Sequence, residues 1–536
     1  MRVSAEHDLD DRPGDPVVVE TWLGAPARSY ARRPATVLDV LDRAVRRWPD
    51  RTCFVDVDGT AVTYAEFAGR VETASAALRA RGLPSGSSVA VASGNTLDLA
   101  TAVFACARAA LVMVGLNTRL APAQWTYMLE HSRVALALGS EAHLDGLRSA
   151  GAADALALAD VLRAASARPW AYVADVRPAQ EATYAVVYTS GTTGRPKASQ
   201  VVHRASVHSG MSYQRVLQLG PDDVTAVLFP MYYISAMHAH VLPAMLAGAS
   251  CVLVDTTSPK DYVALLSAHR VTWAYAVPSW WRLCLRVAGL SDLPALTRLA
   301  AGGAPLPADL VAGLRERLPD VRLYDVYGLS ETHSPGCIAT DEDVRDRPGT
   351  VGRTLDCMEA QVRSDSGDVL GADEAGQLWL SGSLVTTGYA FDPGATAAAI
   401  VDGWFDTGDI ARMDGGGYVT ILDRSKDMIN RGGTKIFSAE VEELLRRHPL
   451  IEDAAVVGVP DTLAGESVAA FVVASAALTA AEVRGWVREQ MADYAAPKLV
   501  EFVEELPRNA VGKTDKPVLR AWLSRPADDS SGREPR

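Results

Sequence analysis

Short apolar runs alternate with longer stretches of helical pattern through most of the chain. The runs are rich in Val, Ala and Leu and are apolar on both faces. Strands of this kind, separated by helices, predict mostly parallel sheets that helices cover on both sides. We expect strands at 88–93, 111–116, 134–139, 184–188, 225–229, 250–254, 273–277 and 321–328, and a helix that begins at Leu97.

The pattern changes near residue 349. Alternating or short apolar stretches at 359–364, 376–382 and 417–423 are joined by turns rich in Gly and Asp. They predict an antiparallel, barrel-like part at about 349–425.

Beyond this part the chain predicts a small α+β unit. A helix is expected at 438–448, with Ser438 as its N-cap and an acidic first turn. Strands at 454–459 and 468–473 and a helix at 480–491 follow.

These patterns predict a large N-terminal domain and a small C-terminal domain. The expected bounds are 16–425 for the first, 426–524 for the second, and 525–536 for a disordered tail.

Composition narrows the possible functions. The chain has 536 residues, of which 48% are hydrophobic and 22% charged, as in ordinary globular proteins. The net charge of -13 argues against a nucleic acid as partner, because phosphate binding needs clustered Lys and Arg.

The acidic N-terminus has no apolar core, and the most apolar stretch contains Asp98 and Arg108. We therefore expect a soluble protein without membrane insertion.

The cysteines indicate a compartment. Six cysteines are scattered along the chain without a CxxC pair. This predicts free thiols in a reducing cytoplasm.

The sequence YTSGTTGRPK at 188–197 has the composition of an anion-binding loop. Its glycines let the backbone approach a ligand, its hydroxyls and N–H groups are donors, and Lys197 adds a positive charge. The spacing does not match GxxxxGK[ST]. These residues by themselves favour a phosphate clamp without identifying the nucleotide.

The loop resembles the phosphate loop of the adenylate-forming superfamily, which includes acyl-CoA synthetases, adenylation domains of peptide synthetases and luciferases. Further stretches resemble superfamily motifs in the same order, so that the resemblance covers roughly residues 40–523. They are AGGAPLP at 301–307, YGLSET at 327–332, PGTVGR at 348–353, the stretch 404–442 and PRNAVGKTDKPVLR at 507–520.

The resemblance implies two half-reactions. A carboxylic acid would attack the α-phosphate of ATP, giving an acyl-adenylate and pyrophosphate. Coenzyme A would then take the acyl group and release AMP. ATP, Mg²⁺ and coenzyme A are the implied cofactors.

The resemblance also implies roles for residues of the matching motifs. Lys197 and Glu331 would take part in catalysis, and Glu331 would help to bind Mg²⁺. The remaining ATP contacts would come from Thr189, Ser190, Gly191, Thr192, Thr193 and Gly194 around the phosphates, and from Gly302, Gly303, Ala304, Tyr327, Gly328 and Ser330 around adenine.

The C-terminal motifs would supply the moving parts. Asp409 and Arg424 would contact the ribose. Lys513 would deliver an ammonium group to the forming adenylate. The C-terminal domain would rotate at the hinge residue Lys426, which would bring Gly432 and Gly433 beside the pantetheine arm.

The expected acyl pocket departs from the family pattern. Tyr233 stands where relatives carry His, or Asp in activators of α-amino acids, and the missing carboxylate argues against an α-amino acid. Aromatic and polar side chains would line the pocket, which favours a small aryl or short-chain acid. The candidates are Tyr233, Ser235, Met237, His238 and His333.

Three alternatives remain open from the sequence. In the first, the acyl group would go to the thiol of a carrier protein. In the second, as in diazotase-like relatives, nitrite would be activated for an arylamine. A protein of another class would bind a nucleotide without catalysis; the intact motif residues argue against it.

Overall fold

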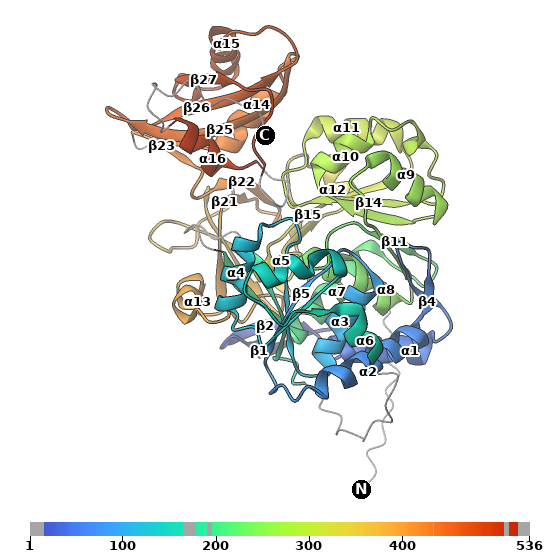
Figure 1. Cartoon of the computed structure of the whole chain (residues 1–536). Coiled ribbons are helices and arrows are strands. Elements are labelled where there is room, and N and C mark those ends of the chain that lie inside the picture. Colours follow the sequence, from blue (N-terminus) through green and yellow to red (C-terminus); the bar gives the residue numbers. More distant parts are fainter. Residues whose placement is uncertain (1–15, 165–177, 190–195, 433, 509–513, 524–536) are drawn as a thin grey trace. The chain divides into compact units, whose positions relative to one another are not determined.

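The computed structural model describes residues 16–164, 178–189, 196–432, 434–508 and 514–523. The chain divides into two compact units, each of which is described by itself below (Figure 1). The first comprises Met1–Gln361, Trp379–Thr407 and Asp414–Val419, and the second comprises Val362–Leu378, Gly408–Met413 and Thr420–Arg536.

A six-stranded sheet of the first unit carries the start of the expected phosphate loop. The strand order is β10-β9-β6-β5-β7-β8, and all pairs are parallel except β9 with β10. The chain therefore leaves β9 and returns antiparallel in β10. The bounds are β5 (Ser88–Ala92), β6 (Val112–Gly115), β7 (Leu136–Gly139), β8 (Leu156–Ala157), β9 (Thr183–Thr189) and β10 (Lys197–Val202).

A nine-stranded sheet forms the rest of the first unit's framework, in the order β17-β16-β15-β14-β13-β11-β12-β3-β4. Its central pairs are parallel, and antiparallel strands close both edges. The bounds are β3 (Thr52–Val55), β4 (Ala61–Thr63), β11 (Val224–Val227), β12 (Ser250–Leu253), β13 (Trp273–Ala276), β14 (Arg298–Gly302), β15 (Arg322–Tyr327), β16 (Cys337–Ala339) and β17 (Arg353–Thr354).

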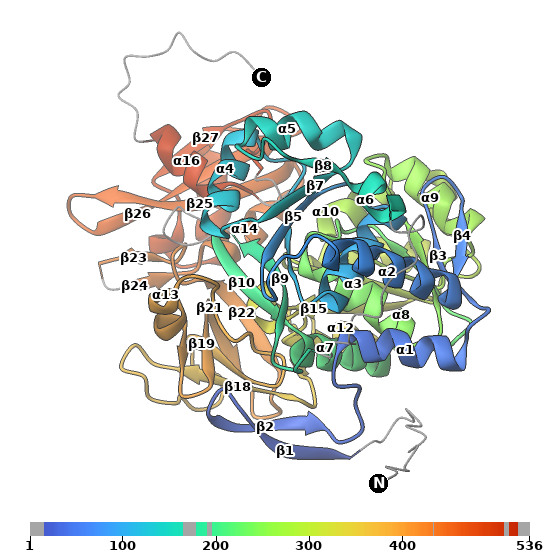
Figure 2. The same ribbon diagram turned by 60° about the horizontal axis from the view of Figure 1, so that its bottom comes forward.

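Helices bury these sheets, as the apolar strands predict. On the nine-stranded sheet, Tyr262, Trp281 and Leu310 of helices α9, α10 and α11 pack against Leu299 and Leu323 (Figure 1). Helices α2 and α3 contact each other beside the smaller sheet (Figure 2). The helices are α1 (Val37–Arg47), α2 (Tyr64–Arg79), α3 (Leu97–Arg108), α4 (Pro122–His131), α5 (Leu144–Ser149), α6 (Leu158–Ala164), α7 (His203–Leu217), α8 (Leu242–Ala247), α9 (Pro259–Ala268), α10 (Pro278–Cys284), α11 (Ala308–Arg317), α12 (Asp341–Asp346) and α13 (Pro393–Ala399).

Two further sheets are smaller than the nine-stranded sheet. An antiparallel hairpin of β1 (Val17–Trp22) and β2 (Ala25–Tyr30), which the sequence did not predict, precedes α1. A five-stranded sheet, in the order β18-β19-β21-β20 with β22 beside β21, is the predicted barrel-like part. Its bounds are β18 (Met358–Arg363), β19 (Gly376–Gly382), β20 (Ile400–Val401), β21 (Trp404–Met413) and β22 (Val419–Arg424).

The second unit folds around a sheet in the order β24-β23-β26-β25, with β27 beside β26. Residues of β25 alternate between two cores: Val456 packs with Val441 of α14, and Val457 packs with Leu519 of α16. The bounds are β23 (Ile429–Arg431), β24 (Thr434–Ile436), β25 (Ile451–Asp461), β26 (Gly465–Ala474), β27 (Leu499–Phe502), α14 (Ser438–Arg446), α15 (Ala480–Gln490) and α16 (Lys516–Leu523).

The start of α14 differs from the sequence-based expectation. Ser438 is the first helical residue rather than the N-cap, which is Phe437 and provides no capping side chain. Instead, Asp423 at the end of β22 accepts hydrogen bonds from the backbone N–H and the hydroxyl of Ser438. A carboxylate from a neighbouring strand thus satisfies the helix terminus.

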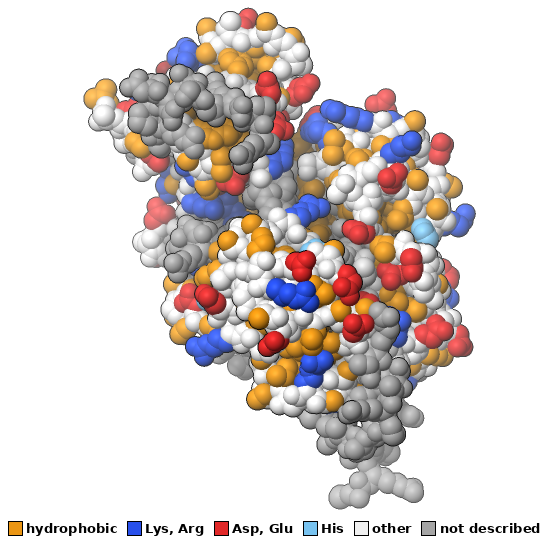
Figure 3. Space-filling view, viewed as in Figure 1, with side chains coloured by type: hydrophobic (Ala, Val, Ile, Leu, Met, Phe, Trp, Pro, Cys, Tyr) orange, Lys and Arg blue, Asp and Glu red, His pale blue; other side chains and the backbone are white. Residues whose placement is uncertain are grey.

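Acidic and basic side chains are interspersed on the face of the first unit that Figure 3 shows. All six cysteines are buried and free, as predicted. Within the ranges that the structure describes, no helix combines the length and the apolar character needed to cross a membrane.

The Asp423 cap gives a test of the second unit's packing. We expect Asp423→Ala to lower the free energy of unfolding of this unit by about 1–3 kcal/mol, because a buried N–H loses its acceptor. The control is Asp365→Ala, which removes an exposed ion pair with Lys435 and should have little effect. Chemical denaturation measures both, and equal effects would contradict the assignment.

Candidate active site

A compact polar cluster in the first unit brings together residues from two motifs and a tyrosine outside them. The Glu331 carboxylate, which is 6% exposed, lies in the short helix η5 (Ser330–Thr332) just after β15. Its Oε1 accepts hydrogen bonds from the hydroxyls of Tyr389 at 2.9 Å and Thr189 at 3.4 Å. The Lys197 ammonium lies 4.9 Å from the centre of the Tyr389 ring. The predicted Glu331, Thr189 and Lys197 therefore lie around one tyrosine.

The chemistry of this cluster fits a magnesium–phosphate ligand. Burial and the charge of Glu331 raise the pKa of Tyr389, so its hydroxyl stays protonated and remains a donor. Glu331 Oε2 accepts no hydrogen bond from the part of the chain that the structure describes. A carboxylate oxygen is a preferred ligand of Mg²⁺, which is usually held by one or two carboxylates together with substrate phosphates.

His333 fastens the loop that carries Glu331. Its Nε2 accepts a hydrogen bond from the Val202 N–H at 3.1 Å, so Nδ1 carries the proton and donates to the Leu384 carbonyl at 3.0 Å. Burial keeps the pKa of His333 well below its usual value. Because backbone groups engage both ring nitrogens, His333 supports the loop rather than presenting a donor to an acid.

The residues expected around adenine lie at the carboxyl ends of two neighbouring strands. β14 ends at Gly302 and β15 at Tyr327, and the strands pair in parallel with Gly302 opposite Val326. Ligands of open α/β sheets bind at this edge. A Cβ atom on Gly302 would lie 2.5 Å from the Val326 carbonyl oxygen, so only glycine fits there.

The remaining members of this group flank the same edge. Gly303 and Ala304 are exposed in the turn after β14, where Gly303 has a φ of +79°. Gly328 and Ser330 follow β15 and are partly buried. A Cβ atom on Gly328 would meet the Pro335 Cα at 3.0 Å.

Asp325, which the sequence analysis missed, is buried within β15 one strand away from Gly302. Burial raises the pKa of its carboxyl to about 7. A single acid inside the apolar run that precedes YGLSET was the available signal, because burying an ionised carboxylate is costly.

A small cavity lies beside β9, two residues before Thr189. None of the residues that line it is charged. Of the predicted pocket residues, Tyr233, Met237 and His238 line this cavity, whereas Ser235 and His333 do not. The other lining residues are Val103, Met113, Gly115, Tyr184, Ala185, Val186, Val187, Val201, Met231, Tyr232 and Ile234.

The polar groups of this cavity are tied to the protein. His238 contacts the Ile234 carbonyl through Nδ1 and the Ser206 hydroxyl through Nε2, both at 2.7 Å. Burial lowers the pKa of His238 to about 4, so the ring is neutral near pH 7. The amide of Asn117, a residue not predicted, donates to the Tyr233 hydroxyl at 2.7 Å. The cavity is therefore neutral and mostly apolar.

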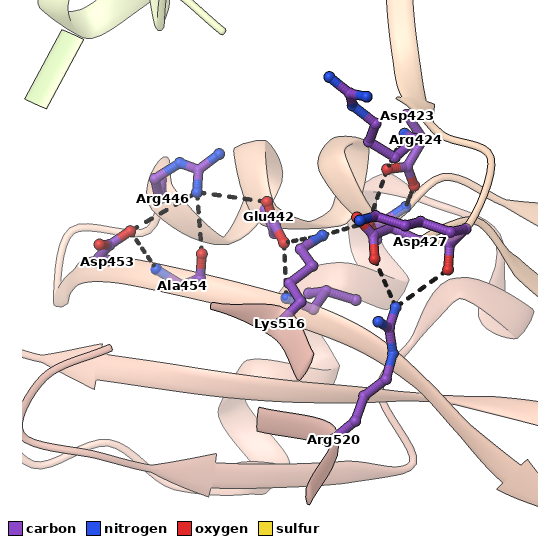
Figure 4. Close-up of polar contacts among 12 residues, drawn as sticks. Asp423, Arg424, Asp427, Glu442, Arg446, Asp453, Ala454, Lys516 and Arg520 are labelled. Atoms are coloured by element: carbon purple, nitrogen blue, oxygen red, sulfur yellow. Dashed lines mark hydrogen bonds and ion pairs between the residues drawn. The ribbon is translucent and has the colours of Figure 1, made fainter. Parts of the chain in front are cut away.

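The second unit carries the expected ribose pair. Arg424 Nε donates to Asp409 Oδ1 at 2.6 Å, and the Asp409 side chain is 2% exposed. Figure 4 shows Arg424 beside Asp423 and Asp427 of the same unit.

Lys426, the candidate hinge residue, lies close to Arg424 in the sequence and contacts the last helix of the unit. The carbonyl of Lys426 accepts a hydrogen bond from Arg520 at 3.3 Å, and the carboxylate of Asp427 accepts one at 2.7 Å (Figure 4). Lys516, one turn earlier in α16, forms an ion pair with Glu442 at 2.8 Å. Gly432 follows β23 with a φ of +61°.

Seven predicted site residues lie outside the described residues. They are Ser190, Gly191, Thr192, Thr193, Gly194, Gly433 and Lys513.

Comparison with known proteins shows the family. The family model "AMP-binding enzyme" matches residues 41–390, and the model "AMP-binding enzyme C-terminal domain" matches residues 440–513. The chain belongs to the AMP-binding enzyme family. A feruloyl-CoA synthase from an Amycolatopsis species is 33% identical over 484 residues, which cover 89% of this chain and 97% of that protein.

Solved structures of AMP-binding enzymes share the fold. The o-succinylbenzoate coenzyme A synthetase MenE from Bacillus subtilis, solved with ATP and a magnesium ion, superposes with a TM-score of 0.81 at 26% identity. The match covers 91% of this chain and 99% of that chain. The amide bond synthetase McbA from Marinactinospora thermotolerans gives a TM-score of 0.83 at 27% identity, over 91% of this chain and 100% of that chain. The predicted family, fold class and enzyme class are confirmed.

Asp325 makes the stability of this AMP-binding enzyme depend on pH. Its pKa is raised from 3.8 to about 7 in the folded protein, so ionising the carboxyl destabilises the fold as pH rises through that window. We expect Asp325→Asn to raise the thermal unfolding midpoint relative to the parent by an amount that grows between about pH 4 and 7 and then levels off.

The matched control for this measurement is Asp292→Asn, which changes an exposed aspartate in the same unit. A difference between Asp325→Asn and the parent that stays constant across the window would contradict the buried-acid interpretation.

Proposed function

We propose that this enzyme is an ATP-dependent, AMP-forming acid–coenzyme A ligase for a small aromatic or short-chain acid. The observation that carries the proposal is the cluster in which Tyr389 joins Glu331, Thr189 and Lys197. Its carboxylate suits a hard cation and its ammonium group suits phosphates, and Lys197 pairs with Thr189, the last residue of β9.

In the first half-reaction, the acid carboxylate attacks the α-phosphate of ATP and pyrophosphate leaves. The 189–194 loop and Lys197 hold the phosphates, and Glu331 Oε2 is the ligand offered to Mg²⁺. When bound, Mg²⁺ neutralises charge on the phosphates. Such reactions depend mainly on positioning and electrostatic stabilisation.

The second unit supplies the remaining groups of the proposed mechanism. Asp409 accepts hydrogen bonds from the ribose hydroxyls, while Arg424 holds its carboxylate in place. Lys513 stabilises the charge that builds on the forming adenylate. We assign residues 426–524 to a mobile domain, with Lys426 as its hinge and Gly432–Gly433 beside the pantetheine arm.

The acid is expected to be apolar beyond its carboxylate. The cavity at Tyr233, Met237 and His238 contains no charged side chain, and its histidine is neutral. An α-ammonium group would therefore lack a partner there. The relative named feruloyl-CoA synthase supports an aromatic acid.

The acceptor distinguishes the main proposal from its alternatives. A carrier-protein thiol could replace coenzyme A, and a diazotase-like relative would activate nitrite for an arylamine. The structural likeness to an amide bond synthetase supports testing amines as well as thiols. A nucleotide-binding protein without catalysis is disfavoured, because the Glu331 cluster is assembled.

A panel of acids tests the function. Acid-dependent exchange of labelled pyrophosphate into ATP is expected with a small aromatic or short-chain acid, and AMP release should then require coenzyme A. If pyrophosphate exchange occurs but AMP release requires an amine or a carrier protein and not coenzyme A, then that compound is the acceptor. No exchange with any acid or with nitrite would refute adenylation.

Lys513 separates the half-reactions. We expect Lys513→Ala to lower the rate of pyrophosphate exchange by about 100- to 1000-fold, because charge in the transition state loses its partner. Thiolysis of a supplied acyl-adenylate should be spared. The control is Lys498→Ala, an exposed lysine of the same unit that pairs with Asp461. Equal loss of both half-reactions in Lys513→Ala would contradict the assigned role.

A further inference from the structure

Residues 386–390, which we call the 386–390 segment, run beside the strand that carries Lys197. The Ala390 N–H donates to the Ala198 carbonyl at 2.8 Å, and the Gln200 N–H donates to the Gly388 carbonyl at 3.0 Å. An antiparallel bridge places Tyr389 opposite Ser199. These bonds hold the backbone of Tyr389 beside β10, opposite Ser199. Ser199 lies two residues after Lys197 on that strand.

The same segment is also attached to the loop of Glu331. The Thr386 N–H donates to the backbone carbonyl of Glu331 at 2.7 Å, and the Thr386 hydroxyl donates to the Gln200 carbonyl at 2.7 Å. One short segment therefore joins the backbone of the carboxylate-bearing loop to the backbone of β10.

A glycine is required within the segment. Gly388 has a φ of +126°, a conformation that L-residues rarely adopt, and a Cβ atom there would collide with the Thr396 side chain. The Thr396 hydroxyl in turn accepts a hydrogen bond from the Tyr389 N–H at 2.9 Å. The backbone on both sides of Tyr389 is held, so the direction of its ring is set by the fold.

The Tyr389 side chain makes two contacts that serve different partners. Its hydroxyl donates to Glu331 Oε1 at 2.9 Å, and its ring face lies 4.9 Å from the Lys197 ammonium. The side chain is 8% exposed. The two contacts can be removed separately, because phenylalanine would keep the ring contact and lose the hydrogen bond.

We propose that Tyr389 is a positioning residue for ATP binding: its hydroxyl holds Glu331 Oε1 so that Oε2 faces the metal–phosphate group, and its ring holds the Lys197 ammonium in place. This inference rests on the proposed function. A carboxylate on a flexible side chain binds a cation best when a second group fixes its orientation, and removal of such partners typically costs about 10- to 100-fold in metal affinity or activity.

Two substitutions separate the hydroxyl from the ring. Both Tyr389→Phe and Tyr389→Leu remove the hydroxyl, so both should raise the Mg²⁺ concentration needed for half-maximal ATP binding by about 10-fold. Only Tyr389→Leu removes the ring, so it alone should further weaken ATP binding at saturating Mg²⁺. Isothermal titration calorimetry with ATP and no acid, at a series of Mg²⁺ concentrations, measures both quantities without turnover.

The matched control is Tyr64→Phe, which removes another buried tyrosine hydroxyl of the same unit that donates to the Ala249 carbonyl at 2.6 Å. It should leave the Mg²⁺ dependence of ATP binding unchanged. Thermal unfolding shows which variants are folded. If only one Tyr389 variant folds, the change in its Mg²⁺ dependence is enough to test the role of the hydroxyl, because both variants lack that group.

The outcomes separate this inference from the proposed function. A folded Tyr389→Phe protein with the Mg²⁺ dependence of Tyr64→Phe would overturn the positioning role, even if the parent exchanges pyrophosphate. A parent that binds Mg²⁺ and ATP but exchanges no pyrophosphate with any acid would refute the proposed reaction and leave the role of Tyr389 in ATP binding supported by the calorimetric shift.

Discussion

The structure of the candidate site depends on a carboxylate that is almost completely buried. A buried charge is stable only when donors or opposite charges surround it. Glu331 receives the Tyr389 and Thr189 hydroxyls on one oxygen, and the ring of Tyr389 lies against the Lys197 ammonium. The parallel strands, the loop after β15 and the 386–390 segment all converge on this arrangement. One oxygen accepts hydrogen bonds from the protein, and the other is the proposed ligand of Mg²⁺.

Histidines surround this region without contributing charge. His333 and His238 are buried, and burial lowers the pKa of both rings. His333 has both nitrogens bonded to the backbone and connects the Glu331 loop to the end of β10. No charged side chain lines the cavity beside His238, which agrees with the apolar acyl group that we propose. Such a lining matters because a charge beside the cavity would favour polar competitors of the acid.

Ion pairs organise the second unit around its last helix. Lys516 and Arg520 lie one turn apart on α16 and face the same side. Lys516 binds Glu442 of α14, and Arg520 binds the Asp427 carboxylate and the backbone just before it. The helix that follows the Lys513 motif is thereby attached to the segment proposed as the hinge, at residues 426–427.

The sequence alone determined the family and the alternation of strands and helices, and it predicted Lys197, Glu331 and Asp409 as candidate site residues, because contiguous motifs and apolar faces are encoded locally. The prediction of Ser438 as the N-cap of α14 was wrong, because the carboxylate of Asp423, from β22, accepts the hydrogen bond at the start of that helix. Only the tertiary structure showed that Tyr389 serves Glu331, 58 residues away. The physical reason is that the partner of a buried charge is chosen by the packing of distant segments, and no local pattern specifies which donor arrives.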